Sequence, residues 1–271
     1  LLCETINMLL QEEFQKLHPY ICIVRYAHDN AATRVLSSIC DLRMIWGGDK
    51  TIEDIKRNPT QARCVELGFA DRYSIAVIEA DTYLQKDPTI VARDFYLDTY
   101  YSDQNACSST RLVLWTGKRV DQAKKLFWES LQKKVNQEYR LSDISGSEKL
   151  LQTAVLAAAC PGIKEIRQNN GLVRIELPEL FEDVMNYKGN CGYFLEYSLE
   201  SLDELACVLD KPCQTVTYLG DHLHDKIKEM IFRKGLRGGD RVVPVGHSLD
   251  LSFVWDGYDM PLTLSRKINN Q

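Results

Sequence analysis

One cysteine of this chain lies in a setting that suits a nucleophile. Cys107 follows the polar run Asp103-Gln-Asn-Ala and precedes two serines, so its neighbours are small or polar. A loop of this kind gives a substrate access to the thiol, and the thiolate is the form that attacks an electrophilic carbon. Backbone amides or a nearby base must favour that charged form. A buried structural thiol is the alternative that the residue types leave open.

The Cys107 loop is predicted to lie between a helix and a strand. Asp87-Pro88 is typical of an N-cap followed by proline at the first helical position, and an apolar stripe follows at helical spacing. Arg111 to Trp115 predicts a strand, and a long helix then buries Val120, Ala123, Phe127, Leu131 and Val135.

The remaining segments predict a mixed α/β chain. Apolar spacing indicates helices at 2–17, Leu150–Ala159, Ser201–Leu209 and Asp221–Phe232. A further helix is expected to run to Ile39 from a cap at Asp29 or Asn30. Short apolar runs indicate strands at Tyr20–Val24, Arg43–Trp46, Tyr73–Ile78, Leu172–Ile175, Tyr193–Tyr197 and Gln214–Tyr218. Strands that alternate with helices favour a parallel sheet.

A second candidate feature is the pair Gly47-Gly48. It follows the predicted strand that ends at Trp46 and precedes a helix that starts at Asp49. A glycine turn at such a junction lets backbone amides contact a phosphate. Gly47 to Thr51 shares residues with the end of a P-loop, but Asp49 separates glycine from lysine and the upstream glycine is absent, so that reading is disfavoured.

Composition excludes several classes of protein. The 271 residues are 45% hydrophobic and 26% charged, and no apolar run approaches the ~18 residues of a membrane span, so we expect a soluble globular protein. A net charge of -5 argues against nucleic-acid binding. Nine scattered cysteines without a C-x-x-C pair favour a reducing cytoplasm and no thiolate zinc site. His222 and His224 are two apart on a helix, which disfavours a metal site, and His247 is expected to be structural.

Two motifs resemble a known family. Asp103-Gln-Asn-Ala-Cys-Ser-Ser109 and the segment Gly239–Asp259, which contains Trp255-Asp256-Gly257, closely resemble the LuxC family of NADPH-dependent acyl-CoA reductases, a branch of the aldehyde dehydrogenases. Further matches occur in the same order along the chain: Trp46-Gly47-Gly48 resembles the cofactor turn, Glu66-Leu67-Gly68 the segment of the general base, and Pro178–Phe181 the segment whose glutamate holds the nicotinamide ribose.

The resemblance implies a reaction. Cys107 would attack an acyl thioester, and hydride from NADPH would convert the acyl-cysteine to a fatty aldehyde. The Cys107 amide and Asn105 would stabilise the oxyanion. Glu66 would take the place of the general base, and a structural carboxylate at a strand end is the alternative for this residue. Trp46, Gly47, Gly48, Glu179 and Phe181 would contact the cofactor. Trp255 is expected either at the mouth of the active site or packed on a tight turn.

The resemblance also implies an organisation. We expect an aldehyde dehydrogenase-like α/β fold, with a partial Rossmann-like cofactor domain at 1–65, a catalytic domain at 66–238 and a C-terminal segment at 239–271. The first half of the cofactor fold would precede Leu1 in a longer polypeptide. Expected partners are acyl-CoA or an acyl-protein, an acyl-protein synthetase and further copies of the full-length chain. A non-catalytic subunit that binds an acyl carrier or a partner is the alternative function.

Overall fold

The computed structural model describes residues 1–27 and 30–268, which form two compact units. The first unit is Leu1–Ala70 and the second is Asp71–Gln271. The predicted boundary after residue 65 falls at the start of strand β2 (Val65–Phe69), and the predicted C-terminal segment 239–271 lies within the second unit.

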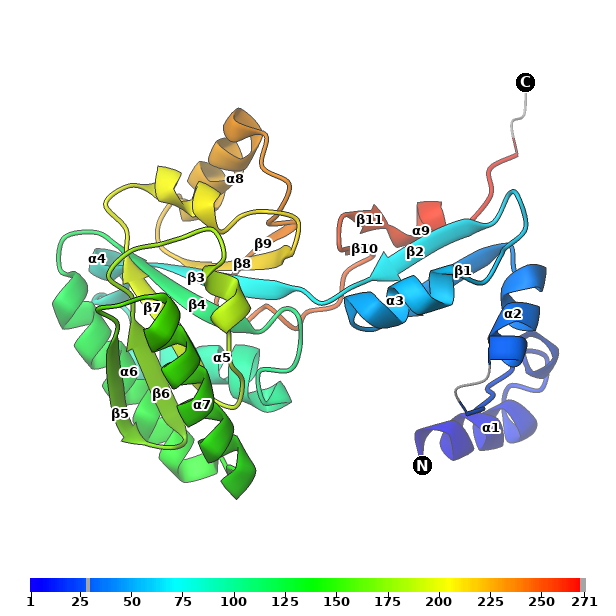
Figure 1. Cartoon of the computed structure of the whole chain (residues 1–271), viewed down its shortest axis with the longest axis horizontal. Coiled ribbons are helices and arrows are strands. Elements are labelled where there is room, and N and C mark those ends of the chain that lie inside the picture. Colours follow the sequence, from blue (N-terminus) through cyan, green and yellow to red (C-terminus); the bar gives the residue numbers. More distant parts are fainter. Residues whose placement is uncertain (28–29, 269–271) are drawn as a thin grey trace. The chain divides into compact units, whose positions relative to one another are not determined.

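The first unit contains a parallel strand pair joined through a helix (Figure 1). Its elements are α1 (Leu2–Glu12), the 3-10 helix η1 (His18–Tyr20), α2 (Asn30–Ile39), β1 (Leu42–Trp46), α3 (Asp49–Lys56) and β2. The pairing of β1 with β2 runs from Leu42 opposite Val65 to Trp46 opposite Phe69. The predicted sequence of strand, glycine turn and helix is therefore confirmed.

Two predictions for the first unit are wrong. The first helix ends at Glu12 instead of residue 17, and Tyr20–Val24 is not a strand. A strand needs a neighbour for its backbone amides and carbonyls, and no strand within residues 1–27 and 30–268 pairs with this segment. Its apolar side chains face solvent, and Val24 is 59% exposed.

The second unit is built on a seven-stranded sheet. Its strands are β3 (Tyr73–Glu79), β4 (Thr110–Thr116), β5 (Lys164–Asn169), β6 (Leu172–Glu176), β7 (Tyr193–Ser198), β8 (Cys213–Leu219) and β9 (Arg241–Pro244). Their spatial order is β5-β6-β7-β4-β3-β8-β9, and every neighbouring pair is parallel except β5 with β6. The central strands β3 and β4 are buried along nearly their whole length, as expected for parallel strands covered on both faces.

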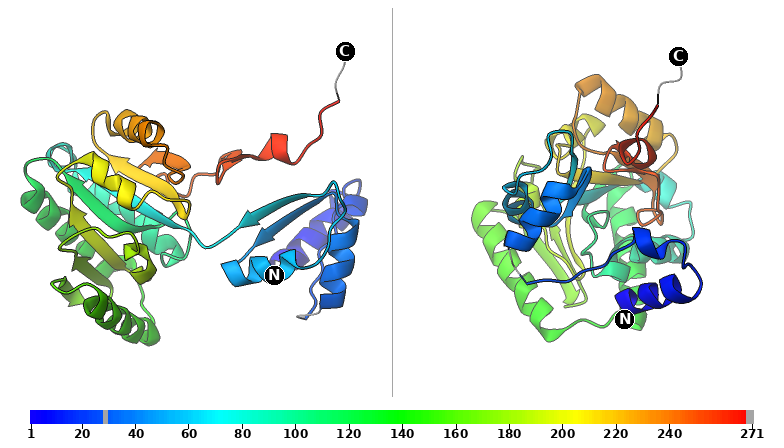
Figure 2. Two further views of the ribbon diagram at one scale, coloured as in Figure 1. Left: turned by 45° about the horizontal axis from the view of Figure 1, so that its top comes forward. Right: turned by 90° about the vertical axis from the view of Figure 1, so that its right-hand side faces the viewer.

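Helices pack on both faces of this sheet (Figure 2). One face packs against α4 (Ala80–Tyr83), α5 (Pro88–Thr99) and α6 (Val120–Glu138), and the short helix η2 (Tyr100–Ser102) continues α5. The other face packs against α7 (Asp143–Ala159), α8 (Leu223–Lys234) and the 3-10 helices η3 (Val184–Tyr187) and η4 (Leu202–Cys207). The mixed α/β prediction is confirmed.

Local signals account for the helices that flank the Cys107 loop. The Asp87 carboxylate accepts a hydrogen bond from the Thr89 amide at 2.8 Å, which caps α5 ahead of Pro88. The buried face of α6 includes four of its five predicted residues, and Val120 is half-buried. Helix α7 begins at Asp143, well before the predicted start at Leu150.

The chain ends in a small hairpin. Strands β10 (Val254–Trp255) and β11 (Tyr258–Asp259) are antiparallel, and α9 (Met260–Thr263) follows. Among the helices of the described residues, none combines the length and the apolar character that crossing a membrane requires.

Candidate active site

Cys107 lies where the central parallel strands of the second unit begin. The cysteine precedes Thr110, the first residue of β4. Because β3, β7 and β8 run parallel to β4 or to its neighbours, their first residues lie at the same end of the sheet, which we call the amino end. The segments that precede Tyr73, Tyr193 and Cys213 therefore meet the Cys107 loop there.

The loop is fixed by a buried glutamine. The Gln104 side chain is fully buried, and its Nε2 donates to the carbonyls of Thr110 at 3.0 Å and Tyr193 at 3.2 Å. Its Oε1 accepts from the amides of Gly192 at 2.6 Å and Tyr193 at 3.0 Å. Asp103 and Gln104 both adopt positive φ values, 52° and 55°, which turn the chain sharply after η2. The four hydrogen bonds hold this strained turn in place.

Hydrogen bonds to backbone and hydroxyl groups hold the rest of the loop. The Ser74 hydroxyl donates to the Cys107 carbonyl at 2.7 Å and accepts from the Thr215 amide at 3.1 Å, which ties the loop to β3 and β8. The hydroxyls of Ser102 and Ser109 lie 3.0 Å apart. The Cys107 thiol itself is partly exposed and makes no hydrogen bond within the described part of the chain. The backbone is thus held while the sulfur stays free.

A second loop contacts the first at the amino end. It comprises residues 189–192 and leads into β7. The Asn190 side-chain amide donates to Asn105 Oδ1 at 3.0 Å, and the Cys191 amide donates to the Asp103 carbonyl at 2.9 Å. The ammonium group of Lys149, a buried residue of α7, donates to the Cys191 carbonyl. The two loops form one structural unit around the thiol.

Arg111 places a positive charge in this unit. The residue is 9% exposed, and its guanidinium donates to the Gly189 carbonyl. Burial lowers the pKa of Arg111, whereas the negative charges of Asp71, Cys107 and Cys191 raise it. An arginine keeps its proton under such a shift, so this nearly buried group stays a cation.

Glu179 and Phe181 lie at the opposite end of the sheet. Both follow the last residue of β6, and β6 runs parallel to β7 and, through it, to β4. Strands of this length separate the two ends by ~15–20 Å. The structure therefore does not bring Glu179 or Phe181 together with Cys107. Their predicted contacts with a cofactor stay predictions.

Glu66 belongs to an ion-pair cluster of the first unit. Arg43, which is buried on β1, donates through Nε to Glu66 Oε2 at 2.8 Å, and Lys56 lies 3.5 Å from Oε1. The same guanidinium donates to the Ser37 hydroxyl at 2.8 Å and the Asn58 carbonyl at 2.9 Å. These bonds tie β2 to β1, α2 and α3, which gives the carboxylate a structural task; its catalytic part stays a prediction.

The Trp46-Gly47-Gly48 turn joins β1 to α3. A Cβ on Gly47 would lie 3.0 Å from the Thr51 side chain, which would have to shift by a few tenths of an ångström, whereas a Cβ on Gly48 would meet nothing within 4 Å. The amide of Gly48, the N-cap of α3, donates to no acceptor within the described residues. The Trp46 ring is 63% exposed and stacks on Phe69 at a centroid distance of 4.5 Å.

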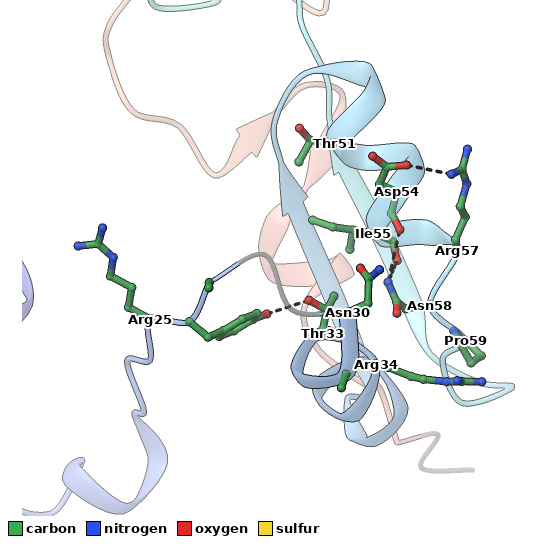
Figure 3. A pocket seen from close by; sticks show the side chains of 13 residues that line it. Arg25, Asn30, Thr33, Arg34, Thr51, Asp54, Ile55, Arg57, Asn58 and Pro59 are labelled. Atoms are coloured by element: carbon green, nitrogen blue, oxygen red, sulfur yellow. Dashed lines mark hydrogen bonds and ion pairs between the residues drawn. The ribbon is translucent and has the colours of Figure 1, made fainter.

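A wide cavity of about 1530 Å³ opens beside the same helix (Figure 3). It is bordered by residues 25–27 ahead of α2, by α2, by α3 and by residues 57–59 after α3, and three arginines lie on its rim: Arg25, Arg34 and Arg57. In Figure 3, Arg34 and Arg57 extend on the side of Asn58 and Pro59, and Arg25 lies across from them. Arg57 pairs with Asp54 at 3.1 Å, and Arg34 has no ion pair within the described residues.

The Trp-Asp-Gly motif forms the tight turn between β10 and β11. Asp256 and Gly257 have φ values of 49° and 79°, as a two-residue hairpin turn requires. Asp256 accepts from the Gln214 amide at 2.5 Å and pairs with Arg72 at 3.3 Å. The Trp255 ring packs against the Arg241 guanidinium at 5.1 Å. Of the two expectations for Trp255, the packed indole on a tight turn is confirmed.

The residues that sequence reasoning missed are those of the second loop and its supports. Arg111 could have been noticed in the sequence, because a cation at the start of a buried apolar strand needs a hydrogen-bond or ion-pair partner. Asn190, Cys191 and Lys149 offered no such signal, since their proximity to Cys107 depends on the pairing of β7 with β4.

Comparison with solved structures identifies the fold as that of the aldehyde dehydrogenases. An NAD-dependent benzaldehyde dehydrogenase from Corynebacterium glutamicum aligns with a TM-score of 0.57 and 11% identity, over 82% of this chain and 50% of that one. An aldehyde dehydrogenase from Bartonella henselae aligns with 0.55 and 14%, over 83% and 50%. An NADP-dependent glyceraldehyde-3-phosphate dehydrogenase from Bacillus halodurans aligns with 0.51 and 12%, over 81% and 48%. The chain spans about half the length of these enzymes.

The sequence narrows the class further. The profile of the acyl-CoA reductase (LuxC) family matches residues 2–142, which is more than half of the chain and includes Cys107. The chain therefore belongs to the LuxC family of acyl-CoA reductases. A comparison with curated proteins gave no match.

Proposed function

We propose that this chain carries the acylation centre of an enzyme that reduces a fatty acyl thioester, on CoA or on a protein, to the aldehyde with NADPH. The observation that carries the proposal is the state of Cys107: its thiol is partly exposed and makes no hydrogen bond to any described residue, whereas hydrogen bonds fix the backbone of its loop. Membership in the LuxC family supports an acyl thioester as the substrate class.

Cys107 would act as the nucleophile. Its thiolate attacks the thioester carbonyl and the carrier thiolate leaves, so the acyl group becomes bonded to sulfur. Water must be kept from the acyl-enzyme, because hydrolysis would release the acid in place of the aldehyde.

Two hydrogen-bond donors are available for the oxyanion of the tetrahedral species. The Cys107 amide donates to no acceptor within the described residues, and the same holds for the side-chain nitrogen of Asn105. Donors that are fixed before the reaction stabilise the developing charge without reorganisation. The contact of Asn105 Oδ1 with Asn190 would orient that nitrogen.

The first unit has features that fit a dinucleotide. The amide of Gly48, which has no acceptor within the described residues and open space beside its Cα, would donate a hydrogen bond to a phosphate oxygen at the start of α3. Arg34 and Arg57 would contact the 2′-phosphate that distinguishes NADPH from NADH. The bound cofactor would supply the hydride that converts the acyl group to an aldehyde.

The acyl-enzyme is tested by mass spectrometry after incubation with a long-chain acyl-CoA. We expect an acyl adduct on the peptide that contains Cys107, and none in Cys107→Ser. Cys191→Ser is the matched control, because Cys191 lies in the adjoining loop and should not carry the acyl group. Acylation that persists in Cys107→Ser would overturn the mechanism. A folded chain that takes no adduct would support the non-catalytic alternative, a subunit that binds an acyl carrier.

The cofactor assignment is tested by titration with NADPH and NADH. We expect Arg34→Ala and Arg57→Ala each to weaken NADPH binding about tenfold, the loss of one charge-assisted contact, and to leave NADH binding nearly unchanged. Arg63→Ala, an exposed arginine of the same unit outside the cavity, is the control. Equal losses for both nucleotides would contradict a 2′-phosphate contact.

A further inference from the structure

Two cysteines of the first unit lie in contact. The sulfur atoms of Cys40 and Cys64 are 3.9 Å apart, although 24 positions separate the residues in the sequence. Cys40 lies between α2 and β1, and Cys64 directly precedes β2. The Val65 amide donates to the Asp41 carbonyl at 3.0 Å, so the backbones beside the two thiols are already paired.

The geometry of this pair is close to that of a disulfide. The parallel register of β1 and β2 begins with Leu42 opposite Val65, so Cys40 lies two residues and Cys64 one residue before the first paired residues. Closure needs the sulfurs to approach by about 2 Å, to the ~2.05 Å of a bond, and side-chain rotation can supply that movement. Both cysteines are partly exposed, so a small oxidant can reach them.

The surroundings of the pair lower the reactivity of Cys40. The Cys40 thiol donates to the Ser37 carbonyl at 3.3 Å, and the Cys64 thiol to the Val65 carbonyl at 3.5 Å. Burial raises the pKa of Cys40, and the hydrogen bond and charge of Cys64 raise it further. A raised pKa lowers the thiolate fraction, which slows random oxidation of this sulfur.

We propose that Cys40 and Cys64 form a reversible disulfide, a redox-sensitive modification site in the first unit. The oxidant is a low-molecular-weight disulfide such as glutathione disulfide. One protein thiolate attacks it and releases one glutathione thiolate; the second protein thiolate then attacks the mixed disulfide and releases the other. Two protein thiols and one glutathione disulfide thus become one protein disulfide and two molecules of reduced glutathione.

The bond would enclose a functional segment. The loop from Cys40 to Cys64 contains all of β1, the Gly47-Gly48 turn and α3. Cross-linking its ends removes conformational freedom from the open and unfolded states of that segment. Oxidation is therefore expected to slow amide hydrogen exchange in β1 and α3. This consequence does not depend on the proposed reductase activity.

The test is a titration of the 271-residue chain in glutathione buffers of fixed reduced-to-oxidised ratio, followed by alkylation, digestion and mass spectrometry. Formation of the intramolecular disulfide from one glutathione disulfide releases two molecules of glutathione, whereas formation of a mixed disulfide releases one. Tenfold dilution of the buffer lowers [GSH]²/[GSSG] tenfold and leaves [GSH]/[GSSG] unchanged. The ratio of disulfide to dithiol for the Cys40–Cys64 pair should therefore rise about tenfold, and the mixed disulfides at Cys3 and Cys22 should not change.

Variants make the assignment specific. In Cys40→Ser or Cys64→Ser the remaining cysteine should carry glutathione, and this adduct should not respond to dilution. Cys3→Ser and Cys22→Ser, exposed thiols of the same unit, should leave the linked peptide intact. The proposal is overturned if wild-type Cys40 and Cys64 stay separately alkylated or separately glutathionylated under conditions that modify Cys3. Because the dilution experiment uses the unaltered chain, poor folding of a variant does not affect that result.

Discussion

Gln104 is a single buried side chain that fixes the loop of the proposed nucleophile, Cys107. It satisfies two carbonyls and two amides at the amino end of the sheet, and so joins the start of β4 to the loop before β7. The positive φ at Gln104 costs energy that these bonds offset. Its role is visible only in the folded chain, where Thr110 and Tyr193 lie side by side.

Truncation of this side chain should therefore harm both stability and reactivity. We expect Gln104→Ala to lower the free energy of unfolding by about 3 kcal/mol, because it leaves buried backbone groups without partners. The rate at which Cys107 is acylated should also fall. Urea denaturation and intact-mass kinetics measure the two effects. Gln85→Ala, whose exposed amide makes one bond to the Asp81 carbonyl, is the matched control and should change neither.

At the scale of elements, one ion pair joins α6 to the sheet. The Lys124 ammonium group, nearly buried on α6, lies 2.9 Å from Glu176 Oε1 at the end of β6, and Lys164 lies 3.8 Å from Oε2. The hydrogen bond from Lys124 is the main cause that lowers the pKa of Glu176 below its ordinary value. Near the pKa of Glu176, the native state therefore binds fewer protons at this carboxylate than the unfolded state does.

This difference predicts a pH dependence of stability. The contribution of Glu176 is fully present above its unfolded pKa of about 4.3, and it is lost as the pH falls through the lower folded value. We expect Glu176→Gln to cost about 1 kcal/mol at pH 7 and to flatten the loss on acidification below pH ~4. Urea denaturation across pH 3–7 tests this. Glu129→Gln, an exposed glutamate of α6, should keep the wild-type profile.

At the scale of the whole molecule, the division into two units separates the two proposed tasks. Every hydrogen bond described for the Cys107 loop has both partners within Asp71–Gln271, whereas the glycine turn and the arginine-lined cavity belong to Leu1–Ala70. Acylation and binding of the dinucleotide are thus proposed for different units of one chain.

A fragment of residues 71–271 should therefore become acylated on Cys107 at the rate of the longer chain, and should not bind NADPH. Circular dichroism establishes first that the fragment is folded, and mass spectrometry then follows the adduct. The same fragment with Cys107→Ser is the negative control. A folded fragment that resists acylation would show that residues 1–70 contribute to the acylation step.

The sequence by itself determined the local features. Gly47-Gly48 between an apolar run and an acidic helix start, Asp87-Pro88 at a helix cap and the four-residue spacing in α6 all act through neighbours along the chain, and each was predicted correctly. The resemblance of Asp103–Ser109 to the LuxC motif identified the family, and the profile over residues 2–142 confirms it.

Only the tertiary structure decided which distant segments meet. Glu179 follows a parallel strand and Cys107 precedes one, so the direction of the strands places them at opposite ends of the sheet. The same strand pairing brings Asn190 and Cys191 to the Cys107 loop, and the pairing of β1 with β2 brings Cys40 to Cys64. The order and direction of strands result from the packing of the whole core, and short stretches of sequence do not encode them.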